Sequence, residues 1–192
     1  MSIILRPDCL PEELMHLTCA TGVYASQAIE YATGKAPRIK WANDLVLGNR
    51  KLGGILTEIF VDPASRKVEW AVIGIGINCS QTITDFPEEI RSIACSLEMP
   101  QQDRAPLIAE LIRSLHTMRQ ELFEKKASIM ESFCRRCITL GKRISIVRGD
   151  QVQHGEALTV DQSGALLVKL DNEQETWVSS GEVSIRGMYG YV

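Results

Sequence analysis

Two lysines and two adjacent glycines lie in a short stretch of the chain. Lys40 and Lys51 carry ammonium groups, and Gly53 and Gly54 follow closely after Lys51. Glycine inside a strand removes the β-carbon and lets another molecule approach the backbone. An ammonium group beside bare backbone suits an anionic ligand, such as a phosphate or an acyl-adenylate. The alternation of side chains along a strand places Gly53 on the face of Lys51.

A second pair of glycines has the same property. Gly74 and Gly76 share one face of a predicted strand with Asn78, whereas the isoleucines between them form an apolar opposite face. We therefore expect a ligand, or another backbone, to approach the glycine face closely. The motif lacks the third glycine that opens a helix in a dinucleotide-binding fingerprint.

Polar residues complete this set. Asp44 suits a magnesium ion or the orientation of Lys40, and Asn43 and Asn78 suit polar ligand edges or phosphate oxygens. Each feature also has a purely structural interpretation. A Gly-Gly pair occurs in β-bulges, Asn-Asp is common in turns, and lysines are common on solvated surfaces.

Other reactive residues carry weaker signals. Cys134 and Cys137 form a Cys-x-x-Cys pair, but no second pair or histidine motif stands near enough to complete a zinc site. His16, His116 and His154 share no motif. The sequence contains no Walker loop, nucleophile elbow or His-Glu-x-x-His segment. We interpret these cysteines and histidines as structural.

The predicted elements change character three times along the chain. A helix over residues 11–33 precedes Gly34, and many small residues on its inner stripe indicate close packing against a sheet. Strand periodicity follows to residue 78 and predicts an antiparallel meander, with strands at 39–41, 45–47, 51–60 and 68–78. Helical patterns then occupy residues 87–97, 106–125 and 127–137.

The last part of the chain has short alternating runs separated by polar turns, at 144–147, 157–160 and 165–168. Such spacing is typical of a small all-β barrel or sandwich. We therefore predict a domain boundary near residue 140.

Composition limits the class of protein. The chain has 192 residues, 45% of them hydrophobic, and a net charge of −3. Such a charge gives no electrostatic reason to bind nucleic acid or an anionic membrane. The first residues are too short an apolar run for a signal peptide, and no run reaches the length of a membrane span. We expect a cytoplasmic protein without nucleic-acid or membrane partners.

Three motifs, in order, closely resemble those of the biotin–protein ligases. Residues 40–45 are Lys-Trp-Ala-Asn-Asp-Leu, residues 50–56 are Arg-Lys-Leu-Gly-Gly-Ile-Leu, and residues 74–78 are Gly-Ile-Gly-Ile-Asn. The ending, with Gly-Glu-Val-Ser at 181–184 before Tyr191 and Val192, resembles the SH3-like domain of the family. The resemblance implies an α+β fold, with a mixed or antiparallel sheet and helices on one side, as in class II synthetases. It also implies a catalytic domain over 1–139 and a small all-β SH3-like barrel over 140–192.

The resemblance also implies a reaction: biotin and ATP give biotinyl-5′-AMP, and a lysine of a biotin carboxyl-carrier domain of acetyl-CoA carboxylase then takes the biotinyl group. Lys51 matches the catalytic lysine that contacts biotin and its adenylate, and Lys40 matches one beside the nucleotide phosphates. The polar residues that surround the nucleotide and Mg²⁺ in the family correspond to Asn43, Asp44 and Asn78, and Asp44 is the implied metal ligand. The residues against which biotin lies in the family correspond to Gly53, Gly54 and Ile55. The resemblance also implies that Gly74 and Gly76 contact the adenylate.

The sequence departs from the family pattern in two places. Ala42 replaces a proline, which removes no functional group. A Ser/Thr-rich strand and a Gly-Arg-Gly-Arg-x-Gly-Arg loop, which precede these motifs in the family, are not in this sequence. We therefore expect weak ligand binding and poor catalysis by this chain alone, since charge-assisted hydrogen bonds contribute about 1.5–3 kcal/mol each.

Three functions stay open on the sequence: a biotin–protein ligase, a non-catalytic ligase-like binding or assembly module, and a lipoate-type ligase. The motif at 40–45 favours the biotin type over the lipoate type. No winged-helix pattern supports a repressor role. An unpaired sheet edge favours self-association, so a homodimer is a further expectation.

Overall fold

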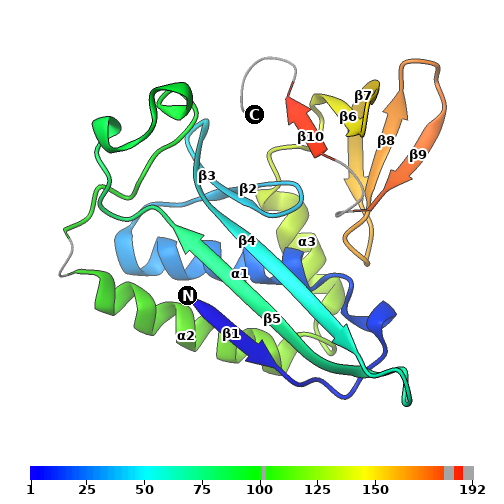
Figure 1. The fold of residues 1–192 in the computed structure, drawn as a ribbon, viewed down its shortest axis with the longest axis horizontal. Helices are drawn as coiled ribbons and strands as arrows, with labels where there is room; N and C mark the ends of the chain where they lie inside the picture. The colour runs from blue at the N-terminus through cyan, green and yellow to red at the C-terminus, as the bar shows by residue number, and fades with distance from the viewer. Residues whose placement is uncertain (101–102, 180–183, 188–192) are drawn as a thin grey trace.

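The computed structural model describes residues 1–100, 103–179 and 184–187. It has an α+β fold with two antiparallel sheets and helices packed against the first (Figure 1). The predicted ending at 181–183 and 191–192 lies outside the described residues. No helix in the described ranges is both long and apolar enough to span a bilayer.

The first sheet has the strand order β1-β5-β4-β3-β2, and every neighbouring pair is antiparallel. Its strands are β1 (Ser2–Leu5), β2 (Arg38–Lys40), β3 (Asp44–Leu47), β4 (Arg50–Val61) and β5 (Val68–Ile77). The predicted meander is therefore confirmed, with a turn at residues 41–43 that divides its first part into β2 and β3.

Helix α1 (Leu17–Thr33) lies behind this sheet in Figure 1. Its small residues allow close packing, because a β-carbon at Gly22 would be 3.2 Å from the Ile39 side chain and 3.7 Å from that of Ile55. The helix ends at Gly34, which has a φ of 71° and donates its N–H to the Glu30 carbonyl. The predicted single helix from residue 11 is instead a 3-10 turn, η1 (Pro11–Leu14), followed by α1.

Two further helices, α2 (Arg104–Glu121) and α3 (Lys126–Arg136), pack on α1. The helix predicted at 87–97 is wrong. That stretch holds only the short η3 (Glu88–Ile90), after η2 (Ile83–Asp85). Lys51 donates its N–H to the Ile93 carbonyl and accepts from Cys95 N–H, so this segment runs along β4. Long-range pairing therefore overrides the local helical pattern.

The second sheet has the order β10-β6-β7-β8-β9, all antiparallel. Its strands are β6 (Arg143–Arg148), β7 (Gln151–Val160), β8 (Leu166–Leu170), β9 (Glu175–Val178) and β10 (Ser184–Gly187). Among the described strands this small β unit is an open sheet rather than the expected closed barrel, because β9 and β10 are its two edges.

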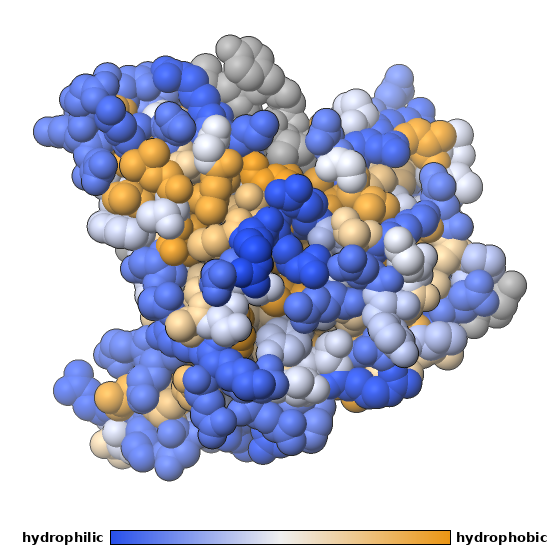
Figure 2. Space-filling model, turned by 180° about the vertical axis from the view of Figure 1, so that it is seen from behind, coloured by the Kyte–Doolittle hydropathy of each residue, from blue (hydrophilic) through white to orange (hydrophobic). Residues whose placement is uncertain are grey.

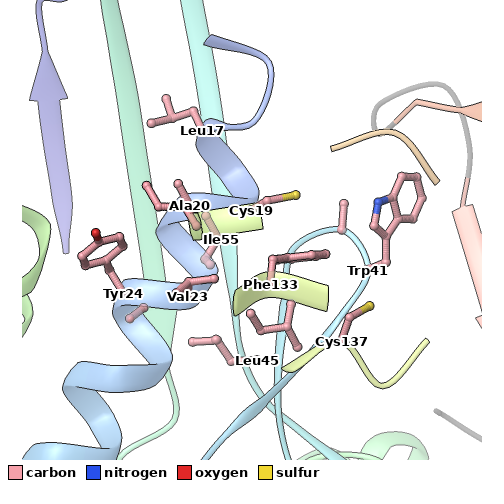
Figure 3. Close-up of a cluster of buried hydrophobic side chains, with 14 of the residues drawn as sticks. Leu17, Cys19, Ala20, Val23, Tyr24, Trp41, Leu45, Ile55, Phe133 and Cys137 are labelled. Atoms are coloured by element: carbon pink, nitrogen blue, oxygen red, sulfur yellow. The ribbon is translucent and has the colours of Figure 1, made fainter. Parts of the chain in front are cut away.

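The two sheets share one hydrophobic core. Figure 3 shows part of it, where α1 contributes Leu17 and Val23, α3 contributes Phe133, and the first sheet contributes Leu45. The same cluster continues into the second sheet through residues such as Leu166. Figure 2 shows the side opposite to that in Figure 1, where hydrophilic residues cover most of the surface and apolar residues gather in patches in its upper half.

Candidate active site

A cavity of about 370 Å³ opens on the face of the first sheet that α1 does not cover. It is lined by Met1, Ser2, Asn43, Asp44, Lys51, Gly54, Ile55, Leu56, Gly74, Ile75 and Gly76. Most of the predicted site residues therefore meet in one place, although three segments of the chain supply them.

Glycines make the floor of this cavity. Gly54 stands opposite Gly76 in the β4–β5 register, and Gly74 stands opposite Leu56. A β-carbon added at Gly74 or Gly76 would have no neighbour nearer than 3.7 Å and 3.9 Å, respectively. The space above these residues is open, so a ligand can lie directly on the backbone of β4 and β5.

An ion pair forms the wall beside the floor. The Lys51 ammonium lies 2.5 Å from the Asp44 carboxylate, and the two side chains are 43% and 18% exposed. A β-carbon at Gly54 would lie 3.7 Å from Lys51 Nζ. The ammonium group therefore stands at the edge of the bare backbone, where an incoming phosphate or carboxylate would meet it.

A β-bulge sets this geometry. Leu45 pairs with Gly53 but Val46 pairs with Lys51, so Leu52 is an extra residue in β4. The extra residue reverses the alternation, and Gly54 rather than Gly53 lies beside Lys51. The prediction that Gly53 shares the face of Lys51 is therefore wrong. Gly53 instead permits close strand contact, because a β-carbon there would lie 2.1 Å from the Gly76 carbonyl oxygen.

Lys40 lies next to the ion pair but outside the cavity lining. It stands opposite Asp44 in the β2–β3 register and is only 9% exposed. Burial lowers the pKa of Lys40; the Asp44 carboxylate opposes this shift and the Lys51 ammonium adds to it. Lys40 and Lys51 thus both lie beside the Asp44 carboxylate.

The two asparagines have different positions. Asn43 lines the cavity, and its turn is fixed to β4 because its side-chain amide donates to the Ile55 carbonyl and its own carbonyl accepts from Ile55 N–H, both at 2.9 Å. Asn78 lies outside the lining. Its amide donates to the Cys95 carbonyl at 3.0 Å and so holds the segment that runs beside β4.

The predicted site residues did not include four that line the cavity: Met1, Ser2, Leu56 and Ile75. Leu56 shares the outer face with Gly54 by strand alternation, so the pattern contained a signal for it. Ser2 reaches the site only because β1 pairs with β5 and places it opposite Gly74. No local pattern indicates such a pairing, so Ser2 could not be found from the sequence.

The assignment of Asp44 as a magnesium ligand stays a prediction. No group of three His, Cys, Asp or Glu side chains in the described ranges could hold a metal ion, and Asp44 already pairs with Lys51. Cys134 and Cys137 are free thiols, and burial raises the pKa of Cys137.

Comparisons with known proteins place the chain. Residues 1–78 match the model of the biotin/lipoate A/B protein ligase family, and residues 139–186 match the biotin protein ligase C terminal domain. The chain belongs to the biotin protein ligase family. The resemblance seen in the three motifs is thus confirmed.

Members of the family align along most of the chain. The bifunctional ligase/repressor BirA of Bacillus subtilis is 31% identical over 192 residues, covering 96% of this chain and 57% of the relative. The biotin--[acetyl-CoA-carboxylase] ligase of Mycobacterium tuberculosis is 28% identical over 149 residues, covering 76% of this chain and 52% of the relative. The chain therefore spans little more than half the length of these relatives.

A solved structure supports the fold. The biotin protein ligase from Aquifex aeolicus in complex with biotin and ATP superposes with a TM-score of 0.72 at 22% identity. The match covers 97% of this chain and 77% of the other. The present chain therefore has the fold of that structure.

Proposed function

We propose that this chain forms a biotin- and ATP-binding site of a biotin–protein ligase, which makes biotinyl-5′-AMP and transfers biotin to a protein lysine. The observation that carries the proposal is the cavity on the open sheet face, where the glycine floor at Gly54, Gly74 and Gly76 lies beside the Lys51 ammonium. This site offers a bare backbone surface for biotin and a cation for the reacting carboxyl-phosphate group.

The proposed reaction has two steps. A biotin carboxylate oxygen attacks the α-phosphorus of ATP, the bond to the β-phosphate oxygen breaks, and pyrophosphate leaves. The amine of the acceptor lysine then attacks the biotinyl carbonyl carbon. The carbonyl–oxygen bond to AMP breaks, AMP leaves, and the amine nitrogen loses a proton.

In both steps the chain acts by positioning and by charge. We propose that Lys51 stabilises the negative charge that develops where carboxylate and phosphate meet, while Lys40 adds to the positive potential that holds the nucleotide. Asp44 orients Lys51 through the ion pair. Asn43 keeps this turn fixed on β4 through its two hydrogen bonds to Ile55.

We propose a biotin carboxyl-carrier domain as the acceptor, in line with the acetyl-CoA-carboxylase named for the Mycobacterium tuberculosis relative. The reaction consumes ATP, which favours the cytoplasm as its location. Strand β1 is an edge of the sheet and its Ile4 is 63% exposed, which favours pairing of two copies. Sedimentation of the purified chain over a range of concentrations tests that pairing.

The decisive experiment measures binding and chemistry together. Titration calorimetry with biotinyl-5′-AMP tests the cavity, and labelled biotin with ATP and a purified carrier domain tests transfer. We expect binding of the adenylate and incorporation of label. Binding without incorporation would overturn the enzymatic function in favour of a binding module, and absence of both would overturn the site itself.

A matched pair of variants tests the lysine. Lys51→Ala should weaken adenylate binding and slow transfer at least about tenfold, because charge-assisted hydrogen bonds contribute about 1.5–3 kcal/mol. Lys169→Ala is the control, since Lys169 is equally exposed at 42% and also forms an ion pair, with Glu173, in the second sheet. Equal effects of the two substitutions would contradict the assignment of Lys51.

A further inference from the structure

Trp41 belongs to the first motif but has no direct role in the cavity. It stands between Lys40 and the Asn43–Asp44 pair, yet it does not line the cavity and is only 5% exposed. Its indole is turned toward the second sheet, at the margin of the buried cluster in Figure 3. Because Trp41 is buried outside the cavity, it can influence a ligand there only through the residues next to it in the chain.

Two hydrogen bonds tie Trp41 to the C-terminal part of the chain. Its indole N–H donates to the Gly164 carbonyl at 2.9 Å, and its backbone N–H donates to the Thr139 hydroxyl at 2.9 Å. Both bonds are buried, so loss of either partner would leave a polar group without water. The orientation of Trp41 is therefore set by residues more than 95 positions further along the chain.

The acceptor Gly164 belongs to a rigid turn over residues 161–165. The Asp161 carboxylate accepts hydrogen bonds from Ser163 N–H, from the Ser163 hydroxyl and from Ala165 N–H, at 2.7 to 3.0 Å. Gly164 has a φ of 91°, and a β-carbon there would lie 3.0 Å from Cys19 Sγ. The turn is thus seated tightly against α1 and offers its carbonyl at a defined place.

On the other side of Trp41, the chain is clamped to the site. Only Ala42 separates it from Asn43, whose carbonyl and amide are both bonded to Ile55 in the cavity lining. Asp44 follows and holds Lys51. The turn at 41–44 is consequently fixed at one end by the second sheet and at the other by β4.

We propose that Trp41 is a positioning residue, through which the turn at 161–165 of the C-terminal unit sets the places of Asn43 and Asp44 in the adenylate site. This proposal rests on the proposed function for its binding readout, but not for its structural readout. It gives the C-terminal unit a part in shaping the cavity, although all the described lining residues lie within residues 1–76.

The test compares two tryptophan-to-phenylalanine variants. Trp41→Phe keeps the ring and removes the indole N–H, whereas Trp177→Phe makes the same change in β9 at a residue that is 49% exposed. We expect Trp41→Phe to weaken biotinyl-5′-AMP binding at least about fivefold, as coupling between sites usually does. Trp177→Phe should bind like the unaltered chain.

Hydrogen exchange separates positioning from general stability. In Trp41→Phe we expect faster exchange of the Ile55 amide, which donates to Asn43, with unchanged exchange of the Ala25 and Ala28 amides in the buried part of α1. Unchanged exchange at Ile55, or equal acceleration at all three amides, would overturn the proposal. This readout needs no ligand, so it still tests the coupling if the chain fails to bind the adenylate.

A second pair of variants approaches the contact from the other side. Gly164→Ala should move the turn, because the added methyl group meets Cys19 Sγ and the positive φ disfavours alanine. It should reproduce the faster Ile55 exchange. The double variant with Trp41→Phe should bind biotinyl-5′-AMP no more weakly than whichever single variant has the lower affinity. Additive losses of affinity in the double variant would show independent effects and overturn the coupling.

Discussion

At the residue scale, glycines of the same two strands have opposite roles. Gly76 has open space above it, since the nearest atom to an added β-carbon is 3.9 Å away. Gly53 has none, because an added β-carbon would overlap the Gly76 carbonyl oxygen at 2.1 Å. Gly76 leaves room for a ligand, and Gly53 leaves room for the neighbouring strand.

Alanine substitutions should separate these roles. Gly76→Ala should leave the melting temperature nearly unchanged but weaken biotinyl-5′-AMP binding, because its methyl group occupies the cavity floor. Gly53→Ala should lower the free energy of unfolding by about 1–3 kcal/mol, the usual cost of overpacking. Urea unfolding and titration calorimetry measure the two effects. A Gly76→Ala protein that binds normally would contradict the proposed floor.

Lys40 should show a conflict between binding and stability. Burial lowers its pKa, so its charged form is disfavoured in the folded chain. That cost is present in full at pH values below the folded pKa. It falls as the pH rises from the folded pKa toward the ordinary pKa, because Lys40 then loses its proton in the folded chain but keeps it in the unfolded chain. At neutral pH, Lys40→Met should therefore melt at or above the temperature of the unaltered chain while binding biotinyl-5′-AMP less tightly. A large drop in the melting temperature of Lys40→Met would contradict the inference that the buried charge costs stability.

At the element scale, the sequence predicts more of the strands than of their registers. Alternation and turn residues located β4 and β5 within a residue or two. The sequence pattern did not predict the bulge at Leu52, because a bulge depends on the pairing of β3 with β4 and not on local pattern. The segment at 87–97 shows the same limit, since its pairing along Lys51 prevails over its helical pattern. The three motifs, by contrast, identified most of the cavity lining.

The turn at 161–165 should weaken in acid. Burial opposes ionisation of Asp161, but its hydrogen bonds from Ser163, Ala165 and Gly164 together hold the pKa below its ordinary value of 3.8. A carboxyl group with a lowered pKa stabilises the fold above its unfolded pKa and loses that contribution as pH falls through the folded value. Asp161→Asn should therefore cost stability at pH 6, and the difference from the unaltered chain should shrink below about pH 4.

Urea unfolding at several pH values measures this difference. Asp150→Asn is the matched control, because Asp150 is an exposed residue of the same sheet region. A pH-independent effect of Asp161→Asn would mean that lost packing, and not lost charge, accounts for it.

At the scale of the whole molecule, the two sheets are one packed body. We propose the boundary between the two units near residue 140, in the segment between α3 and β6. Hydrogen bonds nevertheless cross it: the Trp41 indole N–H donates to the Gly164 carbonyl, and the Cys134 thiol donates to the Val160 carbonyl. A hydrophobic cluster continuous through both sheets accompanies these bonds. Unfolding of one sheet alone would therefore expose apolar residues of this shared core to water.

The chain should therefore unfold in a single cooperative transition. Two tryptophans report on the two sheets separately, because Trp70 stacks on Phe60 in the first and Trp177 lies in β9 of the second. In variants that retain Trp41 and only one of these two tryptophans, both should give the same urea midpoint. Leu166→Ala, at a fully buried position of β8, should lower both midpoints together by removing about 2–5 kcal/mol of stability. A drop seen only by Trp177 would show that the second sheet unfolds independently, and the coupling inferred through Trp41 would then lack its structural basis.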